Sequence, residues 1–389
     1  MRVICSEDKC TGCWACYNAC PKECISMKVG ILGHLFPVID TKKCINCKLC
    51  EKICPSNHPL EKNIPKHTYA AFAKQNAIYS TSTSGGAAAV LSRKILDEGG
   101  IVYGCTCKEN VEITHIRVAD KSDLNKLRGS KYVQSDISFC YKQAKQDLRE
   151  GNKVLFIGTP CQIAGLKAFL RKPYDNLLTV DLICHGVPSQ SYLRDYLKSK
   201  VTSDKIDNVI FREGTNDNVV VVVVVDGKPV YKSNLWKNRY EDDYINAFID
   251  GFTYRPSCHS CQYATMSRVS DITIGDFWGI GDDFVVPHQF GLSCVLANTD
   301  KGVGYVNNIS DQLNIYERTL DEAVAGNAQL RHPQGYNFKI KVFLLLQKYF
   351  GISKAYRIMT YDKRHNWYRN SIIGFLLNKS LGLLNRIFC

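Results

Sequence analysis

Two cysteine runs of identical spacing lie within the first 55 residues, and they restrict the fold of this chain more than any other feature. Each run reads C-x2-C-x2-C-x3-C-P. The first run consists of Cys10, Cys13, Cys16 and Cys20 followed by Pro21, and the second of Cys44, Cys47, Cys50 and Cys54 followed by Pro55. This is the spacing of bacterial ferredoxins, in which the first three thiolates of a run hold one [4Fe-4S] cluster and the fourth holds the other cluster.

The crossing of the fourth cysteine predicts the ligands of both clusters. Cluster 1 takes Cys10, Cys13, Cys16 and Cys54, and cluster 2 takes Cys44, Cys47, Cys50 and Cys20. Zinc is the competing interpretation, because CxxC pairs also form tetrahedral zinc sites. A zinc site explains neither the third cysteine at the same step nor the x3-C-P ending, so iron–sulfur clusters are favoured. Cys5 and Cys24 lie outside the spacing and are expected to be small buried side chains.

The composition is that of a globular protein of a reducing compartment. With 389 residues, 45% hydrophobic and 22% charged, the chain has room for two or three domains with a sizeable core. Its 19 cysteines could indicate a disulfide-rich secreted protein, but the first residues contain no apolar signal-peptide core. We therefore expect a cytoplasmic protein. No run of about eighteen apolar residues is present, so no transmembrane segment is expected.

A formal net charge of +13 raises the question of nucleic-acid binding. Each [4Fe-4S] cluster with four thiolates carries a net charge of about −2, so bound clusters lower this excess. The remaining basic residues are spread over the chain without an arginine-rich tract or a nucleic-acid motif. We therefore expect no nucleic-acid partner. A basic surface suits a phosphorylated cofactor or an acidic electron carrier instead.

The chain divides by pattern into a small domain, a linker, a larger domain and a tail. The predicted fold class is an α+β ferredoxin-like two-cluster domain followed by a mixed α/β flavin-binding domain. Within the first domain, Ile31 to Ile39 is expected to pair as a small hairpin. The expected boundaries are 1–57 for the ferredoxin domain, 58–68 for the linker, 69–150 and 151–330 for the two parts of the α/β domain, and 331–389 for a mostly helical tail with a last helix over 371–389.

Two loops of the α/β region have the residues of a phosphate site. TSTSGG at 81–86 precedes a predicted helix over 87–97, whose N-terminus would present free N–H groups and a positive dipole end to an anion. Ser84 could equally be a simple N-cap of that helix. LRGSKYVQS at 127–135 adds two cations and an aromatic ring. The candidate residues are Ser82, Ser84, Gly85, Gly86, Arg128, Lys131 and Tyr132, with Thr159 as the second place to look.

Two further cysteines follow predicted parallel strands. The strand 153–158 leads into TPCQIAGL with Cys161, and the strand 176–183 leads into Cys184. Because ligands of open α/β sheets bind at the carboxyl ends of strands, Cys161 and Cys184 are expected at the binding edge. RPSCHSC adds Cys258 and Cys261 as a CxxC pair. No motif contains Cys105, Cys107, Cys140, Cys294 or Cys389, which are interpreted as structural.

The segments GTPCQIAGL, DLICHGVPS, RPSCHSC and DITIGDFWG, together with TSTSGG and RGSKYVQS, resemble the coenzyme F420 hydrogenase/dehydrogenase beta-subunit family. The resemblance runs from Cys10 to about residue 330 and is to those members with a fused two-cluster ferredoxin domain. It implies a flavin-binding domain that passes electrons between clusters and a two-electron acceptor, with FAD favoured over FMN. It also implies a third cluster, for which Cys161, Cys184, Cys258 and Cys261 have the right number and type.

The resemblance leaves the function open between two classes, and catalytic residues stay unassigned. One is a flavin-dependent iron–sulfur oxidoreductase with its own two-electron acceptor, either the deazaflavin coenzyme or a small substrate such as a polysaccharide precursor. The other is an electron-transfer subunit that feeds a partner enzyme. A third, less favoured, is a ferredoxin-regulated binding protein without flavin. The expected partners are an electron donor or acceptor protein, the small acceptor and, in a homo-oligomer, a second copy of the chain.

Overall fold

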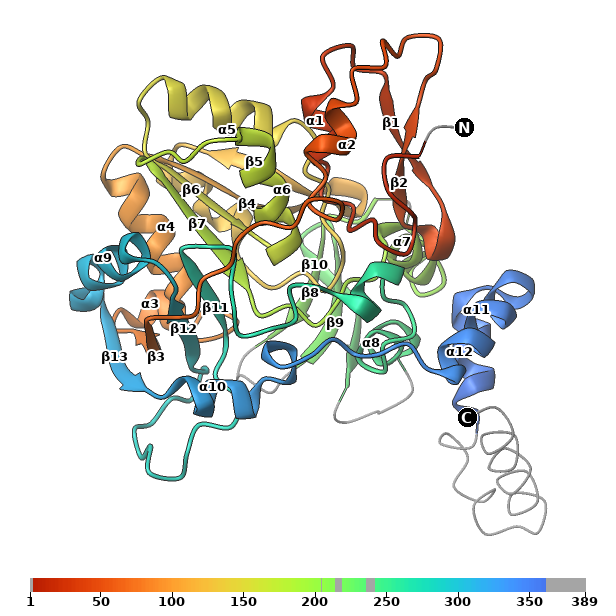
Figure 1. Ribbon diagram of the computed structural model, residues 1–389. Helices are drawn as coiled ribbons and strands as arrows, with labels where there is room; N and C mark the ends of the chain where they lie inside the picture. Colours follow the sequence, from red (N-terminus) through yellow and green to blue (C-terminus); the bar gives the residue numbers. More distant parts are fainter. Residues whose placement is uncertain (1–2, 204, 214–218, 236–241, 362–389) are drawn as a thin grey trace.

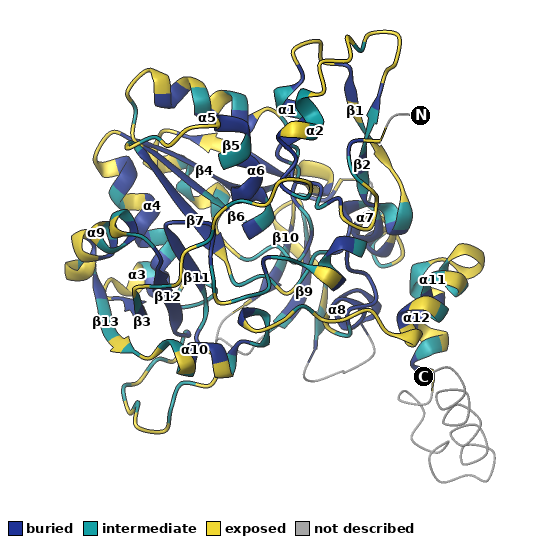
Figure 2. Ribbon diagram, viewed as in Figure 1, coloured by how far each residue is buried: buried dark blue, intermediate teal, exposed yellow. Residues whose placement is uncertain are grey.

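The computed structural model describes residues 3–203, 205–213, 219–235 and 242–361. An eight-stranded mixed sheet forms the centre of the larger α/β domain, and the ferredoxin domain lies against one side of it, near α6 (Figure 1). A separate three-stranded sheet and two C-terminal helices complete the described chain. Buried residues concentrate in the central sheet and the helices that face it (Figure 2).

The ferredoxin domain consists of a hairpin and two short helices. The hairpin pairs β1 (Ile25–Val29) with β2 (Leu35–Ile39), and the helices are α1 (Ala15–Ala19) and α2 (Leu49–Lys52). The expected hairpin is therefore present, but Ile31 to Ile39 supplies only its second strand. Residues 31–33 form a 3-10 turn in which Leu32 and Gly33 take positive φ values of 53° and 75°, so the chain reverses there and the first strand lies before it.

The two cysteine runs have matching backbone conformations, as expected for an internal repeat. Gly12 and Asn46 occupy equivalent positions and have φ values of 64° and 54°; Trp14 and Lys48 are the next equivalent pair, with 64° and 58°. These left-handed residues bend each loop before a helix begins, at Ala15 and at Leu49. The repeat is therefore present in the backbone as well as in the spacing.

The central sheet has the strand order β13-β3-β12-β11-β7-β6-β4-β5. Its inner strands β11, β7, β6 and β4 run parallel to one another, and the outer pairs are antiparallel. The bounds are β3 (His67–Ala73), β4 (Ile101–Lys108), β5 (Glu112–Val118), β6 (Val154–Gly158), β7 (Leu177–Leu182), β11 (Ile272–Asp276), β12 (Ser293–Ala297) and β13 (Leu313–Arg318).

Helices cover both faces of this sheet because successive strand residues point to opposite sides. On one face Val102 and Leu155 pack with α4 (Ala87–Asp97), whose bounds agree with the sequence prediction. On the other face Tyr103 and Phe156 pack with α5 (Cys140–Arg149) and α6 (Pro160–Leu170). The remaining helices of the domain are α3 (Asn76–Tyr79), α9 (Asp300–Asn308) and α10 (Leu320–Gly326).

The second sheet has the order β10-β9-β8 and packs with two helices around buried tyrosines such as Tyr196 and Tyr244. Its strands are β8 (Asn208–Arg212), β9 (Val219–Val225) and β10 (Lys228–Asn234), and its helices are α7 (Gln190–Lys198) and α8 (Asp243–Ile249). The valine run of β9 is thus a central strand with buried residues, and it ends at the turn Asp226-Gly227.

Two segments depart from the sequence expectations. Residues 313–318 form β13 at an edge of the central sheet, although the pattern after the predicted strand 292–298 indicates mostly helical residues. The segment is short, and its backbone hydrogen-bond partners come from β3, which lies far away in the sequence. The local pattern therefore does not indicate a strand. The expected linker, residues 58–68, is tied to the body as well, since Asn63 exchanges backbone hydrogen bonds of 2.7 and 2.8 Å with Arg268.

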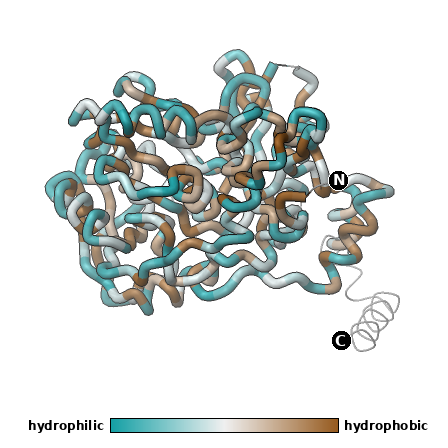
Figure 3. Tube along the Cα trace, turned by 45° about the horizontal axis from the view of Figure 1, so that its top comes forward, coloured by the Kyte–Doolittle hydropathy of each residue, from teal (hydrophilic) through white to brown (hydrophobic). Residues whose placement is uncertain are grey.

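The tail contains α11 (Phe338–Phe350) and α12 (Ile352–Met359), which stand beside α8 in Figure 1. Tyr356 and Phe343 pack on Ala247, Phe252 and Leu32, so these helices contact both the α/β domain and the ferredoxin turn. Figure 3 shows hydrophobic segments along them. The expected helix over 371–389 and Cys389 lie outside the described residues. Within the described part of the chain, no helix has the length and hydropathy needed to cross a membrane.

Candidate functional site

Four cysteines from three separate segments meet at the edge of the central sheet and form what we call the third thiol group: Cys161, Cys184, Cys258 and Cys261. Cys161 lies in the first turn of α6, just after β6, and Cys184 follows β7. Cys258 and Cys261 come from the 3-10 turn Pro256–Ser260 and its end. Burial raises the pKa of Cys161 to about 12 and that of Cys184 to about 11, and repulsion from neighbouring thiolates of the group contributes to both shifts.

The surroundings of the third thiol group suit bound thiolates. Backbone N–H groups of Gly186, Val187 and Tyr263 donate to the sulfur atoms of Cys184, Cys258 and Cys261, respectively, and each lowers the pKa of its thiol. Such N–H···S bonds are among the features that set cluster potentials. Four soft sulfur donors gathered in one half-buried site are the donor set of a [4Fe-4S] cluster, so these residues fit the group.

The first thiol group consists of Cys10, Cys13, Cys16 and Cys54. Burial raises the pKa of Cys13 to about 12, and the nearby thiolates of Cys54, Cys161 and Cys10 add to the shift. Cys54 therefore lies among the first three cysteines of the other run, as the ferredoxin crossing requires. All four side chains are at most 8% exposed, because this group lies at the junction of the ferredoxin and α/β domains.

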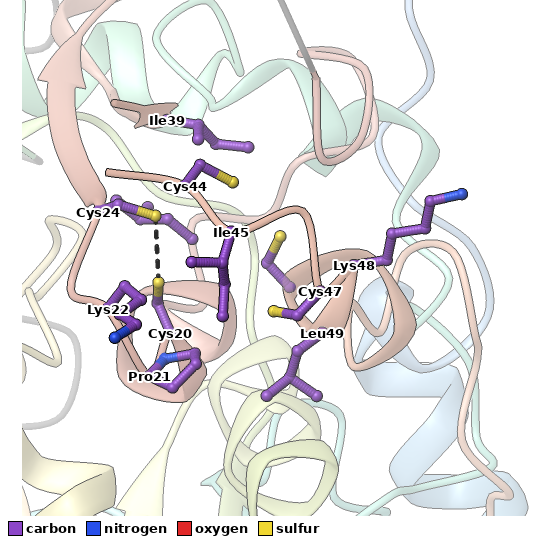
Figure 4. Close-up of a pocket in the computed structure, with 12 residues that line it drawn as sticks. Cys20, Pro21, Lys22, Cys24, Ile39, Cys44, Ile45, Cys47, Lys48 and Leu49 are labelled. Carbon is purple, nitrogen blue, oxygen red and sulfur yellow. Dashed lines mark hydrogen bonds between the residues drawn. The ribbon is translucent and has the colours of Figure 1, made fainter. Parts of the chain in front are cut away.

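The second thiol group consists of Cys20, Cys44, Cys47 and Cys50, which line one pocket of the ferredoxin domain (Figure 4). It lies closer to solvent than the first, since Cys47 is exposed and Cys44 and Cys50 are half-buried. Lys22 and Lys48 line the same pocket and are exposed. This group is therefore the one that a protein partner could approach from solvent.

Two cysteines outside the runs contact these groups, a feature that the spacing does not reveal. The Cys24 sulfur lies 3.3 Å from the Cys20 sulfur, and Cys24 lines the same pocket as the second thiol group. Cys5 forms side-chain hydrogen bonds with Cys10 and Cys54 of the first group. Cys24 is buried, as expected, whereas Cys5 is only half-buried.

The first and third thiol groups are neighbours. Cys161 lies near enough to Cys13 that repulsion between the two sulfur atoms helps to raise the pKa of Cys13. Helix α6 approaches α1 through Gly165, where a Cβ atom would lie 2.9 Å from the Cβ of Cys13. A side chain at residue 165 would therefore push the ferredoxin domain away from the third thiol group. The groups follow one another from the exposed second, through the first, to the third.

Among the described residues, no set of three or more His, Cys, Asp or Glu side chains is arranged around a single metal ion. A cluster differs from one ion in this respect, because its thiolates surround a cube of iron and sulfide instead of converging on one point.

The two predicted phosphate loops meet in the structure. Thr83 and Ser130 share a hydroxyl–hydroxyl hydrogen bond of 3.0 Å, which joins the loop 81–86 to the loop 127–135. Helix α4 begins after Gly86, which has φ 85° and no side-chain cap, so Ser84 is not the N-cap. Gly85 lies against β3, where a Cβ atom would be 2.0 Å from the Ala71 carbonyl oxygen. The glycines thus bring the start of α4 close to the sheet.

The other candidate residues differ in whether their side chains are already engaged in contacts within the protein. Lys131 is half-buried and donates to the carbonyls of Cys105, Leu127 and Arg128 at 2.8–3.1 Å, so its amine holds the loop in shape. Tyr132 is stacked on Phe248. Arg128 is exposed.

Thr159 caps α6, and its hydroxyl lies 3.2 Å from the Cys161 sulfur. The hydroxyls of Ser82 and Ser84 donate to the carbonyls of Ile78 and Leu292.

An ion pair beside these loops was missed by sequence reasoning. Arg212 at the end of β8 donates to the Asp276 carboxylate at 2.6 Å and to the Tyr132 hydroxyl at 3.5 Å. Asp276 is the last residue of β11 and belongs to the segment DITIGDFWG, but Arg212 lies in a strand with no motif around it. Its position beside Asp276 follows only from the packing of the second sheet on the first.

The comparisons with known proteins match the ferredoxin domain and part of the α/β domain. Residues 151–323 match the family of C-terminal domains of the coenzyme F420 hydrogenase/dehydrogenase beta subunit, and residues 9–58 match a 4Fe-4S dicluster domain. A coenzyme F420-dependent sulfite reductase of Methanocaldococcus jannaschii is 22% identical over 316 residues, covering 78% of this chain. This chain spans about half of that relative, 46% of its length.

Two further likenesses cover the ferredoxin domain and the fold. An uncharacterised ferredoxin of Methanocaldococcus jannaschii is 36% identical over 62 residues, which make up 16% of this chain and 79% of that protein. A chain of the F420-reducing [NiFe] hydrogenase complex from Methanosarcina barkeri superposes with a TM-score of 0.45 at 18% identity, over 80% of this chain and 95% of that chain.

Proposed function

The chain is an iron–sulfur oxidoreductase of the coenzyme F420 hydrogenase/dehydrogenase beta-subunit type with a fused 4Fe-4S dicluster domain, and we propose that it conducts electrons between a protein partner and a flavin through three clusters in series. In this proposal the second thiol group holds cluster 2, the first holds cluster 1 and the third holds cluster 3. The observation that carries it is the order of these groups, from solvent-exposed Cys47 to the close approach of α6, which bears Cys161, to Cys13 at Gly165.

The proposed flavin site lies where the loops 81–86 and 127–135 meet. A bound flavin takes up electrons one at a time and gives them up in pairs. Backbone N–H groups at the start of α4 and the exposed Arg128 supply donors and a cation for its phosphates, with FAD favoured over FMN. Lys131 keeps the second loop in shape, and Tyr132 is already held by Phe248. Thr159, the N-cap of α6, places its hydroxyl beside the thiol of Cys161.

A second candidate function is an electron-transfer subunit that has no acceptor site of its own. It is favoured by the match to the sulfite reductase, because more than half of that relative lies outside the part that this chain spans. A coenzyme F420-like acceptor, a polysaccharide precursor and a partner enzyme all remain candidates for the two-electron end. The proposals differ in whether the isolated chain can reduce a small molecule.

We expect the anaerobically purified chain to show flavin and iron–sulfur absorbance together. After reduction with dithionite and removal of the excess, addition of a deazaflavin should reoxidise both chromophores if the chain has its own two-electron site. Reoxidation only after a protein partner is added would support the electron-transfer subunit. Iron–sulfur absorbance with no flavin, even after incubation with FAD and FMN, would contradict both functions and favour the ferredoxin-regulated binding protein.

Replacing Arg128 with alanine should weaken flavin binding while the clusters remain. Loss of one charge-assisted hydrogen bond costs about 1.5 to 3 kcal/mol, which corresponds to a dissociation constant roughly ten- to a hundredfold higher. Fluorescence titration of the apo-flavin protein measures this change. Lys126→Ala is the matched control, because Lys126 is an exposed cation near the same loop whose amine pairs with Asp123 at 2.7 Å. An unchanged constant for Arg128→Ala would move the search to Thr159.

A further inference from the structure

Arg255 is the largest fully buried side chain of the described residues, and it lies between the ferredoxin and α/β domains with 1% of its surface exposed. Its guanidinium donates from Nε to the Cys10 carbonyl at 2.6 Å and from one terminal nitrogen to the Leu35 carbonyl at 2.8 Å. The other terminal nitrogen donates to the side-chain oxygen of Gln134 at 3.0 Å. The guanidinium also lies 4.3 Å from the centre of the Phe36 ring.

Arg255 differs from the other buried arginines in having no carboxylate. Of the three arginines buried in the described part of the chain, Arg268 pairs with Asp181 at 2.9 Å and Arg212 with Asp276 at 2.6 Å. For Arg255 no ion pair with a carboxylate is found among the described residues. A buried charge without a counter-charge is strongly destabilising, so a negative group is expected beside it.

The nearest candidate for that negative group is the sulfur of Cys10. A terminal nitrogen of Arg255 donates to it at 3.4 Å, and Cys10 belongs to the first thiol group. Gly12 leaves the room for this contact, since a Cβ atom there would lie 2.6 Å from a guanidinium nitrogen. The equivalent residue in the second run is Asn46, and the cations near that group, such as Lys48, are exposed to water. The two repeats therefore differ in one buried positive charge.

We propose that Arg255 is the internal counter-ion of cluster 1 and makes it easier to reduce than cluster 2, so that electrons pass inward toward cluster 3. When cluster 2 is oxidised by one electron and cluster 1 is reduced by one electron, the negative charge beside Arg255 increases by one. A cation in a water-excluded site stabilises that added charge more than exposed lysines do, because solvent screens the lysines. Arg255 thus acts as a positioning residue and does not itself exchange electrons.

This inference depends on cluster 1 of the proposed function but not on the flavin or on any acceptor. It is tested by potentiometric titration followed by electron paramagnetic resonance, in the full chain and in a Cys47→Ala, Cys258→Ala background that leaves cluster 1 as the remaining cluster. Arg255→Met should shift the midpoint potential of cluster 1 to more negative values, and Arg255→Lys should keep it near that of the parent protein. Lys48→Met, at the exposed group, should leave all midpoints nearly unchanged.

Arg255→Met removes a buried side chain and could prevent folding, so a second variant keeps Arg255 in place and changes its charge environment. Gln134→Glu is nearly isosteric and puts a carboxylate 3.0 Å from the guanidinium, which neutralises its charge locally. It should shift the cluster 1 midpoint in the same direction as Arg255→Met at unchanged iron content. The proposal is overturned if Gln134→Glu leaves the midpoint unchanged, or if Arg255→Lys and Arg255→Met lower it equally. The second result would mean that the planar hydrogen bonds matter and the charge does not. These readouts would stand even if the protein bound no flavin.

Discussion

Anaerobically reconstituted protein should contain about twelve iron atoms per chain, four for each of three thiol groups, and Cys258→Ala should lower the content to about eight. The reason is that the sulfur atoms of Cys261, Cys184 and Cys161 lie near enough to Cys258 to help raise its pKa by repulsion, after burial, so its sulfur belongs to the same site. Removing one thiolate of four leaves an iron atom without a protein ligand. Iron and sulfide analysis measures the change.

Cys107→Ala is the control for this prediction. Cys107 is a half-buried thiol of β4 that belongs to none of the three groups, so its loss should leave the iron content at about twelve. A content near eight in the unmodified chain would remove cluster 3. The four cysteines would then be structural, and the proposed path would end at cluster 1.

Cys54→Ala should destroy cluster 1 and leave cluster 2, although Cys54 belongs to the second run. In the structure Cys54 lies near the cysteines of the first run, since Cys54, Cys10 and Cys13 all help to raise the pKa of Cys16. Cys5 also forms hydrogen bonds with both Cys10 and Cys54. Pairs of substitutions separate this assignment from one in which each run holds its own cluster. Cys54→Ala with Cys47→Ala should leave about four iron atoms, because two clusters are lost, whereas Cys54→Ala with Cys13→Ala should leave about eight.

The reverse pattern would show that the runs do not cross. If Cys54→Ala with Cys47→Ala kept about eight iron atoms and Cys54→Ala with Cys13→Ala kept about four, Cys54 would hold the cluster of its own run. The single variants cannot make this distinction by iron content alone, since each loses one cluster under either assignment.

The sequence alone predicted the features that depend on short-range order. The two cysteine runs predicted a dicluster ferredoxin domain, and the apolar period of residues 87–97 predicted α4 with its observed bounds. The strands that end before Cys161 and Cys184 were also visible, because buried parallel strands are short apolar runs. In each case the signal lies within a few turns of helix, one strand or one ligand loop.

Contacts between distant segments were decided by the tertiary structure. Arg255 lies 245 residues from Cys10 and looks in sequence like any basic residue before a proline. Cys5 and Cys24 match no spacing, yet both touch ligand thiols. Residues 313–318 become a strand only because β3 offers them a free edge, and the amine of Lys131 is taken up by carbonyls from its own loop and from β4. A residue's type and local pattern set what it can bind, but which partner it meets depends on how the sheets, helices and ferredoxin domain pack together.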